Sequence, residues 1–431
     1  MLGVLRVDRE TPMNAVQPPN GGPKIVIVGA GPVGLMLACE LGRAGIDSMV
    51  LERAQEPSDM PKGNGLVGEI VTVLARRGLL RGQKGLRAIP LPRYSFGTLT
   101  LRLNPLRINP LKALPIPQRR LEELLEGHAR ALGVDVRRGH AVSGFHDDGE
   151  RVGVGVESGE GPYTVTGDFL VGCDGAHSTV RHQLGVGFPG ITGDQLARIG
   201  RVRIPAGQLR RKKNILELSD GQRLVLFQPN HRPAGAISIA PASDLDRSAA
   251  KDVYILAVHE PRNGQDPAEQ IPLQEMQDSI RRVLGVDLPI SDGQWLRSTL
   301  SNSRQAERYR VGRVFLAGDA AHVFSAGGSS LNTGMLDAVD LAARLAAVVG
   351  GEAAVETLEG YHVARHAAGR QTLLQTRAQS ALSAPGENAD ALREVLGAAF
   401  GTRNPHRYIG NLLIGKEPKE PRKRGSRFHE S

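Results

Sequence analysis

The order of hydrophobic and polar residues predicts a strand, a helix and a second strand near the start of the chain. The run from Lys24 to Val28 is apolar after its first residue, as is typical of a strand buried on both faces. A stretch rich in Leu, Met and Ala follows and stops at Gly45, which indicates a helix. "DSMVLER" then predicts a second strand that ends at Glu52. This succession is typical of a parallel α/β sheet.

Two later stretches repeat the succession of strand, turn and helix. The run from Asp168 to Val171 predicts a strand, followed by a Cys-Asp-Gly turn and a helix that begins after Ser178. "RVFLAGD" predicts another strand, which delivers Asp319 to its carboxyl end, and a long helix comes after the next turn. The apolar face of that helix has helical spacing and is expected in the core; it consists of Leu331, Met335, Ala338, Leu341, Ala342 and Leu345.

The middle of the chain has a different pattern. Residues 215–258 contain alternating or apolar runs such as "RLVLFQ", "AGAISIA" and "DVYILAV", which predict strands of a separate sheet with Trp295 in its core. The expected fold class is therefore α/β, with a Rossmann-like domain built on a parallel sheet, an inserted β-sheet domain and a helical C-terminal segment. The expected boundaries are 1–22 for a flexible leader, 23–83, 118–189 and 301–350 for the discontinuous Rossmann-like domain, 84–117 and 190–300 for the β-sheet domain, 351–415 for the helical segment and 416–431 for a disordered basic tail.

Composition narrows the class of protein. The 431 residues carry a net charge of +9, and the tail at 416–431 has six Lys or Arg against three Glu. Because the tail lacks interleaved aromatic residues, it indicates a solvated end, and no nucleic-acid partner is expected. No apolar run is long enough to span a membrane and no signal-peptide pattern begins the chain, so a cytoplasmic location is expected. Cys39 and Cys173 are the only cysteines, which leaves no material for a disulfide framework or a zinc site, and no metal is expected.

The first turn, "IVIVGAGPVG", has the glycine pattern of a dinucleotide-binding site. Gly29 permits the tight turn, Gly31 lets the backbone approach a pyrophosphate, and Gly34 allows close contact between helix and strand. The helix N-terminus offers free N–H groups to that pyrophosphate. Glu52 stands 18 residues after Gly34, at the end of the second strand, and can accept hydrogen bonds from a ribose diol. The pattern predicts dinucleotide binding and does not separate NAD from FAD.

The two later turns are less specific when each is taken alone. Asp174 and Gly175 fit an ordinary turn, and Arg181 fits a solvated cation. Asp319 carries more information, because it stands at the carboxyl edge where open α/β sheets bind ligands. The helix that begins near Leu331 points free N–H groups at the preceding turn, where they would stabilise a negatively charged group such as a reduced flavin.

In this order, "GAGPVG", "CDGAHSTVR" and "LAGDAAH" resemble the group A FAD-dependent monooxygenases, which have the p-hydroxybenzoate hydroxylase fold. "RQAERYRVGRVFLAGDAAH" and "YHVARHAAGRQTLLQTRAQSAL" are similar to the aromatic-polyketide hydroxylase branch of that family. The resemblance covers about residues 24–380. It implies that the Rossmann-like domain binds FAD and that the inserted sheet binds the substrate.

The resemblance also implies roles for matching residues. The first glycine turn would hold the FAD pyrophosphate, Asp319 would lie by the ribityl and pyrophosphate region, and Asn332 by the isoalloxazine edge. The motif with Asp174 is linked in the family to both FAD and NADPH. The implied cofactor-binding residues are Gly29, Gly31, Pro32, Val33, Gly34, Glu52 at the ribose, Arg53, Lys62, Gln118 at the flavin, Val142 near the adenine, Asp174, Gly175, Arg181, Gly318, Asp319, Leu331 and Asn332.

Two positions depart from the family pattern. Lys62 stands where the family usually has an Arg, so that a point charge replaces a bidentate fork. In "FSAGGSSLN" the family's proline is absent, the turn is one residue shorter, and Ser330 replaces a glycine.

The chemistry implied by the resemblance belongs to the cofactor. FAD, reduced by NADPH or NADH, would react with O2, and the resulting C4a-hydroperoxyflavin would hydroxylate an aromatic small molecule, which the branch suggests to be a fused phenolic polyketide. No catalytic acid or base is identified among the side chains, and His322 is interpreted as structural. Candidate substrate contacts are Phe96, Phe227, Tyr254 and Arg304. The expected assembly is a monomer or a homodimer.

Three alternatives remain open. A flavin reductase of a C=C bond would have the same fold. An NAD-linked dehydrogenase would use the first motif and leave the other two unexplained. A non-catalytic binding protein would have kept the fold and lost the flavin or its reactivity. A halogenase of this fold normally carries a Trp-x-Trp motif, which a chain with one Trp cannot contain.

Overall fold

The computed structural model describes residues 23–58, 65–83, 85–103, 111–205, 207, 209–227, 229–245, 249–325, 329–384 and 386–402. The chain divides into two compact units. Unit 1 comprises residues 1–89, 110–192 and 302–374, and unit 2 comprises residues 90–109, 193–301 and 375–431. Each unit has its own sheet and its own hydrophobic core.

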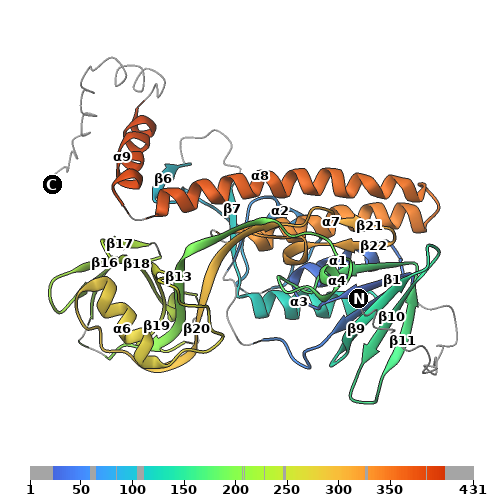
Figure 1. Ribbon diagram of the computed structural model, residues 1–431, viewed down its shortest axis with the longest axis horizontal. Coiled ribbons are helices and arrows are strands. Elements are labelled where there is room, and N and C mark those ends of the chain that lie inside the picture. The colour runs from blue at the N-terminus through green and yellow to red at the C-terminus, as the bar shows by residue number, and fades with distance from the viewer. Residues whose placement is uncertain are drawn as a thin grey trace, which may run out of the picture. The chain divides into compact units, whose positions relative to one another are not determined.

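Unit 1 is built on a sheet with the strand order β21-β22-β12-β1-β2-β8. Figure 1 labels β1, β21 and β22 of this sheet. Its parallel strands are β1 (Ile25–Val28), β2 (Ser48–Glu52), β8 (Asp135–Arg138), β12 (Phe169–Gly172) and β22 (Val314–Leu316). β21 (Arg310–Val311) pairs with β22 in the antiparallel direction. All four residues of β1 are buried, which explains its continuous apolar sequence.

Helices and a second, antiparallel sheet surround this parallel sheet. Helix α1 (Pro32–Arg43) packs against α3 (Gln118–Ala131) and α7 (Ser329–Val349). β9 (Ala141–Asp147), β10 (Val152–Glu157) and β11 (Tyr163–Gly167) form the antiparallel sheet, and Val26 of β1 lies against the end of β11. Further elements are β3 (Gly65–Val67), α2 (Glu69–Arg76), β7 (Lys112–Pro115), α4 (Thr179–Gln183), η1 (Gly318–Ala320), β23 (His322–Val323) and η2 (Val355–Leu358).

Unit 2 is built on the sheet β17-β18-β19-β13-β20. Its strands are β17 (Asn230–Arg232), β18 (Gly235–Pro241), β19 (Val253–Pro261), β13 (Gly190–Arg203) and β20 (Ser291–Gln305). Helix α6 (Leu273–Leu284) packs on β18 and β19 (Figure 1). Further elements are β5 (Arg93–Phe96), β6 (Leu99–Arg102), β14 (Leu209–Lys212), β15 (Ile215–Leu218), β16 (Arg223–Val225), α5 (Ala242–Leu245) and α9 (Glu387–Gly401). The boundary between the units falls within β4 (Ile89–Pro90), β13, β20 and α8 (Glu359–Ser383).

The predicted fold class is confirmed, because a parallel sheet, separate antiparallel sheets and a helical C-terminal segment are all present. The predicted core face of α7 is buried from Met335 to Leu345, whereas Leu331 is half-buried. The core position expected for Trp295 is wrong. Its side chain is half-buried and its φ is +41°, because β20 is irregular there.

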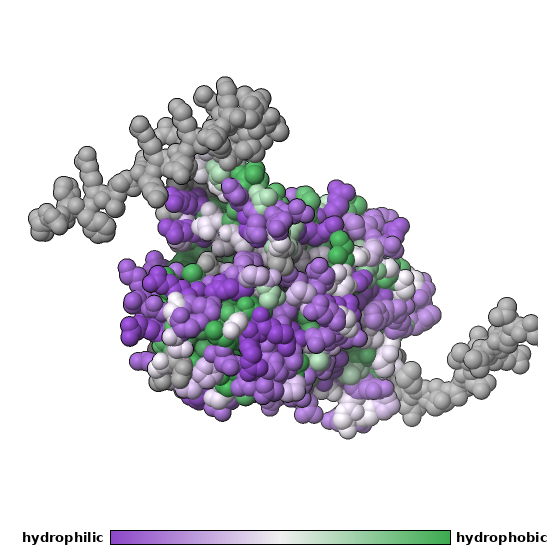
Figure 2. All heavy atoms as spheres, turned by 60° about the vertical axis from the view of Figure 1, so that its left-hand side comes forward, coloured by the Kyte–Doolittle hydropathy of each residue, from purple (hydrophilic) through white to green (hydrophobic). Residues whose placement is uncertain are grey.

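Among the described residues, no helix is both long and apolar enough to cross a membrane. Figure 2 shows hydrophilic residues over most of one face of the protein, with smaller hydrophobic areas between them.

Candidate functional site

The turns singled out in the sequence meet along one edge of the parallel sheet. β1, β2, β12 and β22 pair in parallel, so their carboxyl ends lie at the same edge. Gly29 follows β1 and Glu52 ends β2, while Asp174 lies in the turn after β12 and Gly318 in the turn after β22. Ligands of open α/β sheets bind at this edge.

The turn between β1 and α1 is packed against the turn after β12. Gly29 has a φ of +103°, and a Cβ there would lie 2.6 Å from the carbonyl oxygen of Cys173. A Cβ on Gly34 would lie 2.0 Å from the carbonyl oxygen of Gly29. A Cβ on Gly31 would have no atom within 4 Å. The packing of the protein therefore requires Gly29 and Gly34, whereas Gly31 leaves open space at the start of α1.

Val33 connects the first and third motifs. Its Cγ2 would lie 2.9 Å from a Cβ on either Gly318 or Gly334, and a Cβ on Gly334 would be 2.8 Å from the Cα of Gly318. Gly334 thus lets α7 pass close to η1 and α1. The sequence analysis missed this residue, although a glycine inside a helical pattern often marks such a close approach.

Glu52 is held by backbone N–H groups. Its carboxylate accepts one hydrogen bond from the N–H of Ala30 and one from the N–H of Ala54, both at 2.8 Å. Each carboxylate oxygen keeps a further lone pair, so the predicted ribose contact does not require these bonds to break. That contact stays a prediction.

The Asp-Gly turn after β12 contains an unpaired buried oxygen. Oδ2 of Asp174 accepts a hydrogen bond from the N–H of Val180 at 3.2 Å, whereas Oδ1 is buried and has no partner among the described residues. Arg181 is 2% exposed and donates to the carbonyl oxygens of Ala176 at 2.8 Å and Ala320 at 2.9 Å. Its interpretation as a solvated cation is therefore wrong, and burial lowers the pKa of its guanidinium. Arg181 ties the second motif to the third.

The departure at Ser330 makes a specific contact. The hydroxyl of Ser330 donates to Oδ1 of Asp319 at 2.6 Å, a bond that the glycine of the family pattern could not form. Two residues later, Oδ1 of Asn332 accepts a hydrogen bond from the N–H of Val67 in β3 at 2.8 Å. Residues 326–328 of this turn lie outside the described residues.

A buried carboxylate missed by the sequence analysis lies behind the third motif. Asp337 in α7 is fully buried, and its oxygens lie 2.6 Å from Nε2 of His322 and 2.6 Å from Nε of Arg365. Asp337 also accepts a hydrogen bond from the N–H of Gly318 at 3.2 Å. His322 is fully buried, in line with the structural role expected for it, and it stacks on Phe324. Asp337 therefore fixes the Gly318 turn to α7.

The other predicted cofactor residues lie in separate elements. Gln118 begins α3 and donates from Nε2 to Glu122 at 2.8 Å, Val142 lies in β9, and Lys62 falls outside the described residues. The remaining predicted residues lie at the motif turns. Pro32 is the first residue of α1, and Arg53 follows β2 and is exposed. Gly175 has a φ of +85°, and Leu331 is half-buried.

The candidate substrate residues do not share one unit. Phe96, Phe227 and Tyr254 lie in unit 2, and Arg304 lies in unit 1. Phe227 is 54% exposed, and Tyr254 packs against the core beneath α6. Arg304 donates to the carbonyl oxygen of Phe188 at 3.2 Å and to Oγ1 of Thr192 at 2.8 Å. Each substrate contact stays a prediction.

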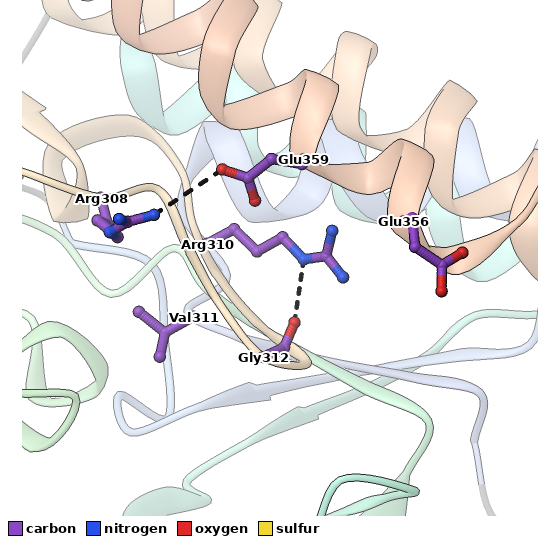
Figure 3. Close-up of a pocket in the computed structure, with 6 residues that line it drawn as sticks. All are labelled: Arg308, Arg310, Val311, Gly312, Glu356 and Glu359. Carbon is purple, nitrogen blue, oxygen red and sulfur yellow. Dashed lines mark hydrogen bonds and ion pairs between the residues drawn. The ribbon is translucent and has the colours of Figure 1, made fainter.

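A pocket of about 520 Å³ lies elsewhere in unit 1, between the β21–β22 hairpin and the start of α8 (Figure 3). Glu359 points toward Arg308 at 4.0 Å, and Nε of Arg310 donates to the carbonyl oxygen of Gly312 at 3.0 Å. The turn of this hairpin lies just before β22, whereas Asp319 lies just after β22. The pocket and the candidate site are therefore at opposite ends of this strand.

Comparison with known proteins decides the family. The family described as "FAD binding domain" matches residues 23–376. The chain belongs to this family. It is 37% identical over 405 residues to the 12-dehydrotetracycline 5-monooxygenase/anhydrotetracycline 6-monooxygenase of Streptomyces rimosus, covering 92% of this chain and 77% of the relative. It is 35% identical to the dialkyldecalin synthase of Streptomyces rugosporus, covering 91% and 80%.

Solved structures agree with this assignment. The structure of the anhydrotetracycline hydroxylase of Streptomyces rimosus is similar with a TM-score of 0.75 and 36% identity, covering 92% of this chain and 76% of that one. Relatives named monooxygenases match most of the chain at 34–37% identity. This member of the FAD-binding family is a flavin-dependent monooxygenase by class.

The residues at the sheet edge fit FAD. The open space at Gly31 admits a pyrophosphate beside the free N–H groups of α1. Glu52 provides acceptor oxygens for a ribose, and the unpaired Oδ1 of Asp174 provides an acceptor for a ligand hydroxyl or N–H group.

Proposed function

We propose that this chain oxygenates a fused phenolic compound of the polyketide type, with NADPH or NADH as electron donor and O2 as the source of oxygen. The observation that carries the proposal is the convergence of Gly31, Asp174 and Asp319 at one sheet edge, although some 290 residues separate the first from the last. The aromatic class of substrate is supported by the printed names of the tetracycline-pathway relatives.

Each part of the site has its own task. The start of α1 would hold the pyrophosphate and Glu52 the adenosine ribose. Asp319, oriented by Ser330, would hold the middle of the cofactor. The N–H groups at the start of α7 would favour negative charge on the flavin. When bound, FAD supplies the redox chemistry, which is electron uptake from NAD(P)H and activation of O2. The protein positions the substrate and excludes water.

The experiment starts with the visible spectrum of the purified protein, alone and after incubation with FAD. We expect flavin bands that heat releases into the supernatant. The holoenzyme is then incubated with anhydrotetracycline, NADPH and ¹⁸O2, and the product is analysed by mass spectrometry. Faster NADPH oxidation and one ¹⁸O atom in the product are the expected results. A protein that takes up no FAD would overturn the proposal, and so would substrate-stimulated NADPH oxidation without an oxygenated product across a panel of polyphenols.

One observation favours a second candidate function. The relative named dialkyldecalin synthase is nearly as similar to this chain as the monooxygenases are. A cyclase would change the retention time of a substrate and leave its mass unchanged. A flavin reductase would add two hydrogen atoms, so product mass separates all three activities.

A further inference from the structure

The sheet of unit 2 has two unlike faces. One face packs against α6 and carries Val202 of β13 with Leu256 and Val258 of β19. Leu296 of β20 belongs to the same face, because it fills the space beside Gly200 and joins the same core. This face is apolar and buried.

Alternation places arginines on the other face. Successive strand residues point to opposite sides, so Arg201, which precedes Val202, points away from α6, and so does Arg297, which follows Leu296. β13 and β20 are neighbouring strands. Ile199 and Ile255 lie on this face as well, since Ile255 is directly opposite Arg201. The face thus carries apolar side chains together with Arg201, Arg297 and, by the same alternation, Arg203.

Neither Arg201 nor Arg297 has a hydrogen bond or an ion pair with another residue in the part of the chain that the structure describes. Arg201 and Arg297 are half-buried, and their Nε atoms are shielded from solvent without a hydrogen bond to any described residue. Neighbouring arginines differ. Arg198 is paired with Glu260 and Glu275 on the α6 side. Arg203 forms ion pairs with Asp252 and Asp292. Arg201 thus differs from both of these arginines of β13.

Leaving these charges unpaired costs free energy. A partly desolvated charge without a partner is unfavourable, and like charges on adjacent strands repel each other. An anion bound to the guanidinium groups on this face would reduce both penalties. The Nη atoms are not shielded as the Nε atoms are, so each planar fork can donate to a ligand oxygen. The apolar side chains of Ile199 and Ile255 beside them can pack against the face of an aromatic ring system.

We propose that Arg201 and Arg297 determine substrate specificity by binding an anionic oxygen, phenolate, enolate or carboxylate, of a flat aromatic substrate on this face. The aromatic class of substrate rests on the function proposed above. The anion contact is independent of turnover and can be measured by binding alone.

The test uses the FAD-loaded protein and two probes with the same ring frame. Anthraquinone-2-carboxylate carries the anion, and 2-hydroxymethylanthraquinone is neutral. Binding of each probe is measured by isothermal titration calorimetry, which needs no chromophore at the site. We expect the wild type to prefer the carboxylate. Arg201→Gln and Arg297→Gln should each weaken carboxylate binding on the order of 10- to 100-fold and change neutral binding less than about twofold.

Two controls make the result specific. Arg203→Gln removes a paired charge from the same strand and should change neither affinity. Arg201→Lys and Arg297→Lys keep the charge without the fork and should bind the carboxylate with intermediate affinity. These variants also replace the glutamine variants if those unfold.

Several results would overturn the proposal. Equal affinity of the wild type for the two probes would overturn it without any variant. Equal weakening of both probes would show that the arginines only support packing. If the variants lose 2′,5′-ADP binding and keep carboxylate binding, the arginines serve the nucleotide instead. Oxygenation activity plays no part in these outcomes, so failure of the proposed function would be seen separately, as a missing oxygenated product.

Discussion

Replacing Asp337 by Asn should unfold unit 1 at a markedly lower temperature. The substitution keeps the shape of the side chain and removes its charge. Asp337 is fully buried, and the side chain of Arg365, whose Nε lies 2.6 Å away, is 15% exposed. In the variant, the guanidinium of Arg365 stays buried without the carboxylate that it contacts. The NH2 group of the Asn side chain is a hydrogen-bond donor, and it would face Nε of Arg365, which is a donor too.

The magnitude follows from this geometry. Removing one partner of a buried ion pair costs about 3–5 kcal/mol, because the remaining charge is desolvated and uncompensated. For a domain of this size, each kcal/mol lowers the unfolding temperature by about 2–4 °C, so the expected loss is about 6–20 °C. FAD affinity should fall as well, since Asp337 also holds the N–H of Gly318 beside Asp319.

The assay is thermal unfolding followed by circular dichroism, with and without saturating FAD. Asp340→Asn is the matched control, because Asp340 lies one turn further along α7 and pairs with Arg344 in a half-exposed ion pair. That pair is worth less than about 1 kcal/mol, so the control should lose no more than about 4 °C. Equal losses in the two variants would refute the reasoning that burial makes Asp337 important.

Three further predictions test the site. Gly31→Ala should leave the unfolding temperature of the FAD-free protein unchanged, because its Cβ has no protein atom within 4 Å. It should weaken FAD binding by about tenfold or more, because that Cβ would occupy the space proposed for the pyrophosphate. Gly34→Ala should lower the unfolding temperature even without FAD, because its Cβ would clash with the carbonyl oxygen of Gly29. Ser330→Ala should weaken FAD binding by about 2- to 10-fold in a fluorescence titration, as it releases Asp319; a gain in affinity would show that this bond competes with the cofactor. Burial lowers the pKa of His259 below its ordinary 6.5, so the unfolded chain binds a proton that the folded chain does not, and stability should fall as the pH drops below about 6.5. His259→Asn should show a smaller fall between pH 7 and 5 in denaturant titrations, and an unchanged fall would contradict this account.

The sequence by itself determined the strands and glycine turns that frame the candidate site in unit 1. Strands buried on both faces require continuous apolar runs, and the runs that begin at Lys24 and Asp168 became β1 and β12 with ends shifted by one residue. The glycine turn was equally visible, because Gly29 and Gly34 are required locally by the backbone. Such features depend on residues close together in the chain.

Only the tertiary structure decided which acidic and basic side chains pair with one another. Nothing local distinguishes Asp337 from Asp340, yet the first is buried beside His322 and Arg365 while the second is half-exposed beside Arg344. Arg201 and Arg203 differ in the same way, since pairing depends on acids that lie some fifty to ninety residues away in the chain. The physical reason is that desolvation and charge pairing depend on neighbours in space. The sequence therefore determined the framework of the candidate flavin site, and the folded chain decided which charged side chains are paired with one another.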